Sequence, residues 1–393
     1  MDVSQRAKQL MPSAIAETGD AARTSDVRSV AEVIDLAEGD PNFATPSAIV
    51  EGAVDGLRLG LTHYSSARGL GTLRRAILEG QAEFRDAGYE AESNIVITPG
   101  AKFALYAALM CLVDPGDNVM VLDPSWVSYD QMIRLAGGVP VHVPSTSADH
   151  FFPVAYERTV HSIPAKVWIL NSPHNPTGRV YREAELRILL NWATADGAYV
   201  IADEIYKDIT YDVPHCSVAT FPEFRDRVLV VGGFSKTFAM TGWRLGYVVG
   251  PSSVLDKVAQ FQQHTATCAA PFIQHAAEAT TKSRAVRRGV DVMLADYRHR
   301  RAAVEEVLSG VAGLEVAPME GTFYAWVAVS RLGITSAEFA RRLLREHGVA
   351  VVAGLAFGEC GNGWIRLCYG RQDLDTLRRA LERFGEFVAR LVA

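Results

Sequence analysis

The sequence has few cysteines, no CxxC pair and no excess of positive charge. Without paired cysteines neither a disulfide framework nor a zinc framework is expected, so we predict no metal and a reducing, cytoplasmic compartment. The net charge is −6 and the sequence pI is about 6.0, which gives no sign of binding to the phosphates of nucleic acid. The five cysteines are scattered, at Cys111, Cys216, Cys268, Cys360 and Cys368.

Long apolar runs are missing as well. No run reaches the roughly 18 apolar residues of a membrane-spanning helix, and the first residues, MDVSQRAKQLMPSA, lack the apolar segment of a secretory signal. We therefore expect no membrane partner. What the chain does contain is 49% hydrophobic and 21% charged residues over 393 positions, the composition of a globular protein with a large core.

From about residue 93, short apolar runs such as NIVIT and RVLVVGG alternate with polar turns and expected helices. Strands that are apolar throughout predict a mostly parallel sheet covered by helices on both faces. We therefore predict an α/β protein with a large domain at 46–284. A smaller α+β domain at 285–393 begins with a long charged helix, and residues 1–45 form an N-terminal arm and part of that small domain.

Polar side chains follow five of the predicted strands. Ligands of open parallel sheets bind beyond the carboxyl ends of the strands, so these side chains are expected to converge on one region. Lys236 stands out, because a lysine between a buried strand and a compact glycine-containing segment either extends its amine into water or uses it in a site. The converging residues are Gly100, Ala101, Lys102, Trp126, Asn175, Asp203, Tyr206, Ser235 and Lys236.

Four motifs occur in a fixed order: NSPHNPTG, ADEIY, SKTFAMTGWRLG and WIRLCYG. With them the chain resembles the class I/II aminotransferases, the aspartate aminotransferase-like family of fold type I pyridoxal 5'-phosphate (PLP) enzymes, over almost its whole length. The resemblance implies the fold type I architecture and PLP as the cofactor. It also implies exchange of an amino group between an α-amino acid and an α-keto acid, through a lysine Schiff base in ping-pong half-reactions. The partners would be these small molecules and a second copy of the chain, in a homodimer with shared active sites.

The resemblance assigns catalytic roles to Lys236, Asp203 and Tyr206. Lys236 matches the Schiff-base lysine, since only a primary amine forms an imine that a substrate amine can displace; the alternative is a lysine that extends into solvent. Asp203 matches the carboxylate that keeps the pyridine nitrogen protonated; the alternative is a helix N-cap. Because neighbours in a strand point to opposite faces, Glu204 is expected to face away.

Three residues match groups around the cofactor ring. Asn175 and Tyr206 match the pair that hydrogen-bonds the phenolic oxygen, although Asn175 by itself is typical of a turn. Trp126 matches an aromatic residue that stacks on the ring, although a tryptophan after a strand is also typical of a core.

The phosphate of the cofactor is expected at the start of a helix. Gly100, Ala101 and Lys102 open that helix, where free N–H groups favour an anion and small residues permit close approach. Ser235 and Arg244 would complete the cradle, with Arg244 as a bidentate partner. Tyr64, in THYSSARGLGTLR, matches the tyrosine that reaches the phosphate from the neighbouring subunit. The family usually carries serine or threonine at the position of Gly233, so one phosphate contact differs here.

Arg366 lies in an otherwise apolar run, and a buried guanidinium needs an anion. The resemblance implies that it binds the substrate α-carboxylate, with the backbone of Gly39 on the other side and Trp126 and Asn175 nearby; the alternative is a structural salt bridge. Lys102 matches a lysine that holds the distal carboxylate in aspartate and prephenate aminotransferases, so an aspartate- or glutamate-like donor is expected. Departures from that subgroup at Ile15, His174 and Ala353 leave another acidic donor, an aromatic donor or a guanidino donor open.

Two other functions stay open from the sequence alone. A divergent PLP enzyme of the same fold would use the same residues for elimination, cyclisation or oxidation of an amino acid. A non-enzymatic module that binds the cofactor is the second, although every candidate catalytic residue is present and no basic patch or extra domain is visible.

Overall fold

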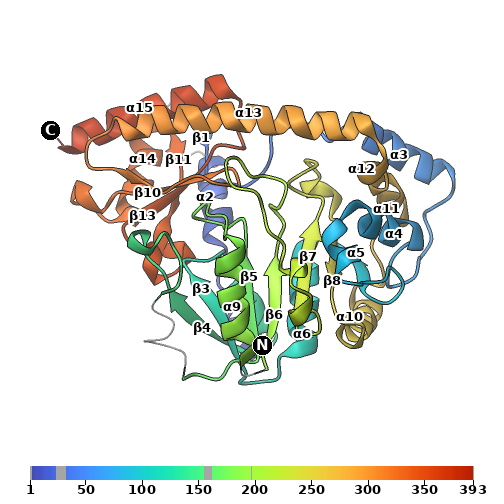
Figure 1. Ribbon diagram of the computed structural model, residues 1–393. Coiled ribbons are helices and arrows are strands. Elements are labelled where there is room, and N and C mark those ends of the chain that lie inside the picture. Colours follow the sequence, from blue (N-terminus) through green and yellow to red (C-terminus); the bar gives the residue numbers. More distant parts are fainter. Residues whose placement is uncertain (1, 24–31, 155–161, 196, 393) are drawn as a thin grey trace.

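A computed structural model describes residues 2–23, 32–154, 162–195 and 197–392 (Figure 1). Residues 24–31 of the predicted N-terminal arm therefore lie outside the described residues. Within the described ranges, no helix combines the length and the apolar character that crossing a membrane would require.

A seven-stranded sheet forms the centre of the larger part of the protein, in the order β2-β8-β7-β6-β5-β3-β4. Only β8 runs against its neighbours, pairing antiparallel with both β2 and β7. The prediction of a mostly parallel sheet is therefore confirmed. The strands are β2 (Ile95–Thr98), β3 (Asn118–Asp123), β4 (Val139–Pro144), β5 (Val167–Asn171), β6 (Tyr199–Asp203), β7 (Val228–Gly233) and β8 (Gly246–Val249).

Successive residues of these strands enter two different apolar cores. In β7, Val228 and Val230 pack into one core, whereas Leu229 and Val231 pack into the other. Helices α4 (Gly71–Gly80) and α9 (Glu183–Ala195) close the first core. Helices α6 (Ala101–Leu112), α7 (Ser128–Leu135) and α10 (Ser252–Thr265) close the second. This arrangement explains why the strands are apolar throughout rather than alternating.

The prediction that a helix follows each strand is wrong for two connections, those after β6 and after β7. The crossover from β6 to β7 contains, in the described residues, only the 3-10 turns η3 (Val218–Thr220) and η4 (Pro222–Phe224). After β7 the chain makes one such turn, η5 (Thr241–Trp243), before β8. Because β8 is antiparallel to β7, that connection needs no crossover helix.

The C-terminal residues form a second, antiparallel sheet in the order β12-β13-β10-β9. The chain near the N-terminus joins this part through β1 (Ile34–Asp35), which pairs in parallel with β11 (Val349–Ala350). Helices α14 (Ser336–His347) and α15 (Leu374–Val392) pack here. The long α13 (Arg284–Ser309) runs along both parts of the molecule (Figure 1). The strands of the sheet are β9 (Glu315–Val316), β10 (Tyr324–Ala328), β12 (Val352–Ala353) and β13 (Trp364–Cys368).

The remaining described α-helices are α1 (Gln5–Lys8), α2 (Ala14–Arg23), α3 (Ser47–Arg58), α5 (Ala82–Asp86), α11 (Pro271–Ala277) and α12 (Ala279–Lys282). Of these, α3, α5, α11 and α12 lie at the right-hand end of Figure 1, whereas α2 lies beside β1.

Candidate active site

A cavity of about 410 Å³ lies beyond the carboxyl ends of β5, β6 and β7 and is closed on its far side by the second sheet. The structure brings most of the predicted site residues to it; Gly100 and Tyr64 do not line it. The predicted residues in its wall are Gly39, Ala101, Lys102, Trp126, Asn175, Asp203, Tyr206, Ser235, Lys236, Arg244 and Arg366.

Lys236 follows β7 and lies in the wall of the cavity rather than extending into solvent. Its Nζ donates a hydrogen bond to the backbone oxygen of Gly39 at 2.7 Å, and no acidic side chain of the described residues lies within ion-pair distance. Burial lowers the pKa of Lys236 to about 8, while the charge of Asp40 acts in the opposite direction. An amine with a lowered pKa is more often in the neutral form that attacks carbonyl carbon.

Asp203 is the last residue of β6 and only 4% of it is exposed. Its carboxylate accepts hydrogen bonds from the hydroxyl of Tyr129 at 2.8 Å and from the backbone N–H of Ile205 at 3.2 Å. Burial raises the pKa of Asp203 to about 6, and these two donors limit the rise. Above a pH of about 6 this carboxylate is ionised and can pair with a positive group that enters the cavity.

Glu204, the neighbour of Asp203, faces away from the cavity. Its carboxylate accepts hydrogen bonds from the hydroxyl of Ser217 at 3.0 Å and from the N–H of Val218 at 2.9 Å, and lies 3.1 Å from the His215 ring. The alternation expected from a strand therefore holds at the end of β6.

Arg366, on β13, is 1% exposed. It donates to Oδ1 of Asn175 at 3.0 Å and to the backbone oxygen of Ala37 at 2.6 Å, and its guanidinium lies over the ring of Tyr324 at 4.3 Å. Its Nε has no hydrogen-bond partner, and no carboxylate of the described residues forms an ion pair with it. The structural salt bridge that was the alternative is absent from the described part of the chain, so the charge is available for an anion in the cavity.

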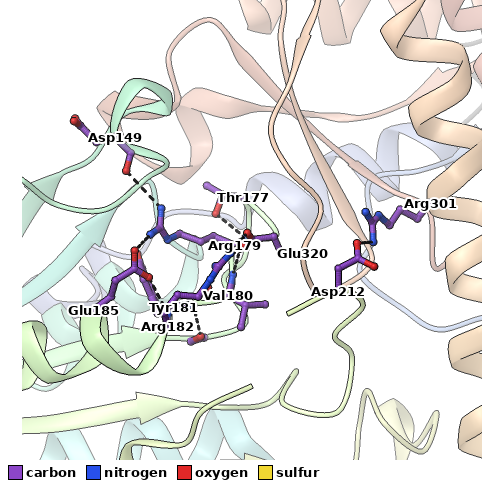
Figure 2. Close-up of polar contacts among 11 residues, drawn as sticks. Asp149, Thr177, Arg179, Val180, Tyr181, Arg182, Glu185, Asp212, Arg301 and Glu320 are labelled. Atoms are coloured by element: carbon purple, nitrogen blue, oxygen red, sulfur yellow. Dashed lines mark hydrogen bonds and ion pairs between the residues drawn. The ribbon is translucent and has the colours of Figure 1, made fainter. Parts of the chain in front are cut away.

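The chain that follows Asn175 is held by the charged residues Arg179 and Arg182, whose contacts Figure 2 shows. Arg179 forms an ion pair with Glu185. Arg182 pairs with Glu320 at 2.7 Å, and the same glutamate accepts a hydrogen bond from the N–H of Val180 at 2.9 Å. Since Glu320 belongs to the C-terminal part, its bonds to Arg182 and Val180 hold the two parts together (Figure 2).

Positive groups gather at the start of α6. Gly100 has a φ of 90°, and a Cβ there would clash with the guanidinium of Arg244, so only glycine permits this approach. Arg244 is held by its hydrogen bond to the backbone oxygen of Thr241 at 2.8 Å. The Lys102 amine lies 4.7 Å from the centre of the Trp126 ring, and burial together with the charge of Arg244 lowers its pKa. The helix N-terminus, Ser235 and Arg244 form a cradle for an anion such as phosphate.

Two tyrosines of the site were missed by sequence reasoning. Tyr129 lies one helical turn after Trp126, and this spacing was the available signal. Tyr324, whose hydroxyl lies 2.8 Å from that of Tyr206, is on β10 of the other sheet, where the rule about strand ends gives no signal.

These groups fit the functional parts of PLP. The cradle suits its phosphate, Asp203 suits the pyridine nitrogen, and Asn175 and Tyr206 suit the phenolic oxygen, while Lys236 suits the aldehyde. Tyr64 lies outside this cavity, and 84% of it is exposed.

Comparison with known proteins gives one consistent result. Residues 31–384 match the family described as aminotransferase class I and II. The chain is 36% identical over 385 residues to the aspartate aminotransferase of Pyrococcus abyssi, which covers 98% of this chain and 97% of that protein. It is 33% identical over 385 residues to aromatic-amino-acid aminotransferase 2 of Thermococcus litoralis, with the same coverage. The solved structure of aspartate aminotransferase from Thermus thermophilus with maleate matches it with a TM-score of 0.91 and 36% identity, over 98% of this chain and 99% of that one.

Proposed function

The chain belongs to the class I and II aminotransferases, and on this basis we propose that its preferred amino donor is a dicarboxylic α-amino acid. It is a PLP-dependent enzyme that exchanges an amino group between an amino acid and a keto acid. The relatives are aminotransferases, so the alternatives of elimination, cyclisation or oxidation and of a non-enzymatic module are not favoured.

When bound, PLP supplies an aldehyde carbon that takes up the amino group and a ring that accepts electrons from the substrate Cα. In our proposal Ser235, Arg244 and the first N–H groups of α6 hold the phosphate, and Asp203 holds the ring nitrogen. Lys236 then accepts the proton from the substrate Cα as a general base and returns it as an acid. Its lowered pKa supports this role, because a base that works near neutral pH must be able to lose its proton there.

Four cations that line the cavity have no ion-pair partner among the described residues: Lys102, Lys236, Arg244 and Arg366. The proposal uses Lys236 and Arg244 for the cofactor, which leaves Arg366 and Lys102 for the substrate. Arg366 is suited to the α-carboxylate that every amino acid carries, through two parallel N–H donors. Lys102 lines the same cavity, and within the described residues no carboxylate pairs with it. A second carboxylate on the substrate would neutralise this amine. The relative from Thermus thermophilus was solved with maleate, which is a dicarboxylate.

An aromatic donor is the second candidate, because part of the wall is apolar. Ile15, Ala16 and Leu105 line the cavity together with Trp126, and the relative from Thermococcus litoralis is named for aromatic amino acids. A guanidino donor has less support. The acids among the described residues of the cavity wall are Asp203, which the proposal gives to the ring nitrogen, and Glu38, which is already paired with Arg371 at 3.0 Å.

Replacing Lys102 by methionine tests the substrate class. In the parent enzyme we expect aspartate or glutamate to give the highest kcat/KM among aspartate, glutamate, phenylalanine, arginine and alanine. In Lys102→Met we expect kcat/KM for the dicarboxylic donors to fall about 10- to 100-fold, the value of one lost charged hydrogen bond, with little change for alanine. Alanine is the matched control substrate, because it has no distal carboxylate.

The same kcat/KM values would also reveal a donor that is not dicarboxylic. A parent enzyme that prefers phenylalanine, with equal losses for all donors in Lys102→Met, would contradict the dicarboxylic proposal. The dissociation constant of PLP, measured for both proteins, separates an effect on the cofactor from one on the substrate.

We also propose a homodimer that shares its active sites, because an apolar stripe on α3 has no cover in a single chain. Val50, Val54 and Leu57 are exposed at a spacing of one face of a helix, and the exposed Leu59 and Tyr64 follow. A second copy on this surface would bury the stripe and bring Tyr64 toward the partner's phosphate cradle. The cytoplasmic location and the domain boundaries at residues 46 and 284 stay predictions.

Mixing two inactive variants tests the shared site. In the proposed dimer each site combines Lys236 of one chain with Tyr64 of the other. A hybrid of a Lys236→Ala chain and a Tyr64→Ala chain therefore has one site that carries both changes and one site that carries neither. After subunit exchange at equal amounts we expect about a quarter of the parent activity, since half of the dimers are hybrids with one intact site each. If Tyr64 acts within its own chain, the mixture will show no more activity than the two variants measured separately.

A further inference from the structure

Tyr206 and Tyr324 connect the two sheets of the protein inside the active-site cavity. Tyr206 follows β6 of the central sheet, whereas Tyr324 is the first residue of β10 in the C-terminal sheet. Their hydroxyl oxygens lie 2.8 Å apart and both side chains are buried. Within the described residues, neither hydroxyl has another hydrogen-bond partner. The pair therefore shares one hydrogen in the bond between them and leaves one hydrogen free.

The position of Tyr324 is fixed on several sides. A Cβ on Gly39 would clash with its hydroxyl, so a glycine is needed there for the close approach. Its backbone N–H donates to Oγ1 of Thr322 at 3.2 Å, and Thr322 is buried with a φ of 64°, which a β-branched residue rarely adopts. The ring of Tyr324 lies under the Arg366 guanidinium at 4.3 Å.

We infer that Tyr324 is a positioning residue that donates its hydroxyl hydrogen to Tyr206, so that the hydrogen of Tyr206 is free to point into the cavity. This inference rests on the proposed function, in which Tyr206 donates that hydrogen to the phenolic oxygen of PLP. If Tyr206 donated to Tyr324 instead, it would have no hydrogen left for the cofactor.

Two physical effects support this direction of the bond. The positive charge over the Tyr324 ring favours the loss of its proton and makes it the stronger donor. Burial raises the pKa of both tyrosines and the charge of Arg366 limits the rise in both, but it is the Tyr324 ring that the guanidinium covers. A hydroxyl that accepts a hydrogen bond also becomes a better donor, because hydrogen bonds in a chain polarise one another.

The test is a pH titration of the visible absorbance of the PLP-loaded protein, which reports the ionisation of the bound chromophore. In Tyr206→Phe we expect the midpoint to rise by about 1 to 2 pH units, since a charged hydrogen bond to the ionised oxygen is lost. In Tyr324→Phe we expect a rise of about 0.3 pH unit, the size of a cooperative contribution to that bond. The double variant should titrate like Tyr206→Phe alone.

Tyr369→Phe is the matched control. It removes a buried hydroxyl that bonds to Tyr211 at 3.1 Å and to the backbone oxygen of Thr322 at 3.2 Å, without touching Tyr206. We expect it to lower the melting temperature as Tyr324→Phe does and to leave the midpoint unchanged.

Three results would overturn the inference. The first is a midpoint of Tyr324→Phe that equals the midpoint of the parent and of the Tyr369→Phe control, which would mean that the bond has no influence on the cofactor. The double variant would exceed Tyr206→Phe if Tyr324 acted without Tyr206. An unchanged midpoint in Tyr206→Phe would instead disprove the role proposed for Tyr206, and the role of Tyr324 with it.

Discussion

Replacing Lys236 by alanine is expected to abolish turnover while the protein keeps its fold. In the proposed mechanism this amine moves the proton at the substrate Cα, and among the described residues Lys102 is the only other lysine that lines the cavity. Loss of a general base together with the covalent attachment should lower kcat at least about 10⁴-fold. The fold should survive, because the Nζ makes one hydrogen bond, to the oxygen of Gly39, in the described structure.

The measurements are the rate of keto acid formation, the visible absorbance after addition of PLP, and the thermal unfolding curve. Lys257→Ala on α10 is the matched control, since within the described residues its amine bonds only to the nearby Gln260. A small primary amine added to Lys236→Ala should restore part of the rate if the missing group is the base. Parent-like activity in Lys236→Ala would disprove the assignment of the lysine.

Replacing Asp203 by asparagine is expected to lower turnover and to stabilise the cofactor-free protein at the same time. Turnover should fall at least about 100-fold, because a neutral amide no longer holds a protonated pyridine nitrogen in a dry site. The amide stays in contact with both neighbours: its oxygen accepts from the N–H of Ile205, and its NH₂ donates to the oxygen of the Tyr129 hydroxyl, whose own hydrogen no longer bonds to residue 203.

The gain in stability depends on pH in a defined direction. Burial raises the pKa of Asp203 from 3.8 to about 6, so the folded protein binds this proton more tightly than the unfolded chain does. The stabilising effect of the proton is complete below the unfolded pKa and is lost as the pH rises through about 6. At pH 8 the buried charge costs about 3 kcal/mol, and asparagine avoids this cost.

We therefore expect Asp203→Asn to have a higher melting temperature than the parent at pH 8, and little difference near pH 4, when both are free of PLP. Glu204→Gln is the control. It weakens hydrogen bonds to Ser217 and Val218 on the other side of the strand and should destabilise the protein instead. A parent that is more stable than Asp203→Asn at pH 8 would contradict the raised pKa.

The sequence by itself determined the class of fold and predicted most of the residues that meet in the cavity. Strands such as Val228–Val231 are apolar on both faces, which only a sheet covered on both sides satisfies, and the cores on each side confirm this. The strand-end rule and the family motifs identified Lys236, Asp203 and Asn175, because the residue that follows a strand is a local property of the chain.

Only the tertiary structure decided which groups meet. Tyr324 and Arg366 come from neighbouring strands of the C-terminal sheet, and their place beside Tyr206 depends on how two sheets pack. The local sequence pattern predicts whether a side chain is buried. It does not predict the partner of a buried group, because the two groups can lie on segments more than a hundred residues apart, as Tyr206 and Tyr324 or Asn175 and Arg366 do. The absence of an acidic partner for Arg366 in the described residues is such a fact, since 45 acids in the composition leave it undetermined.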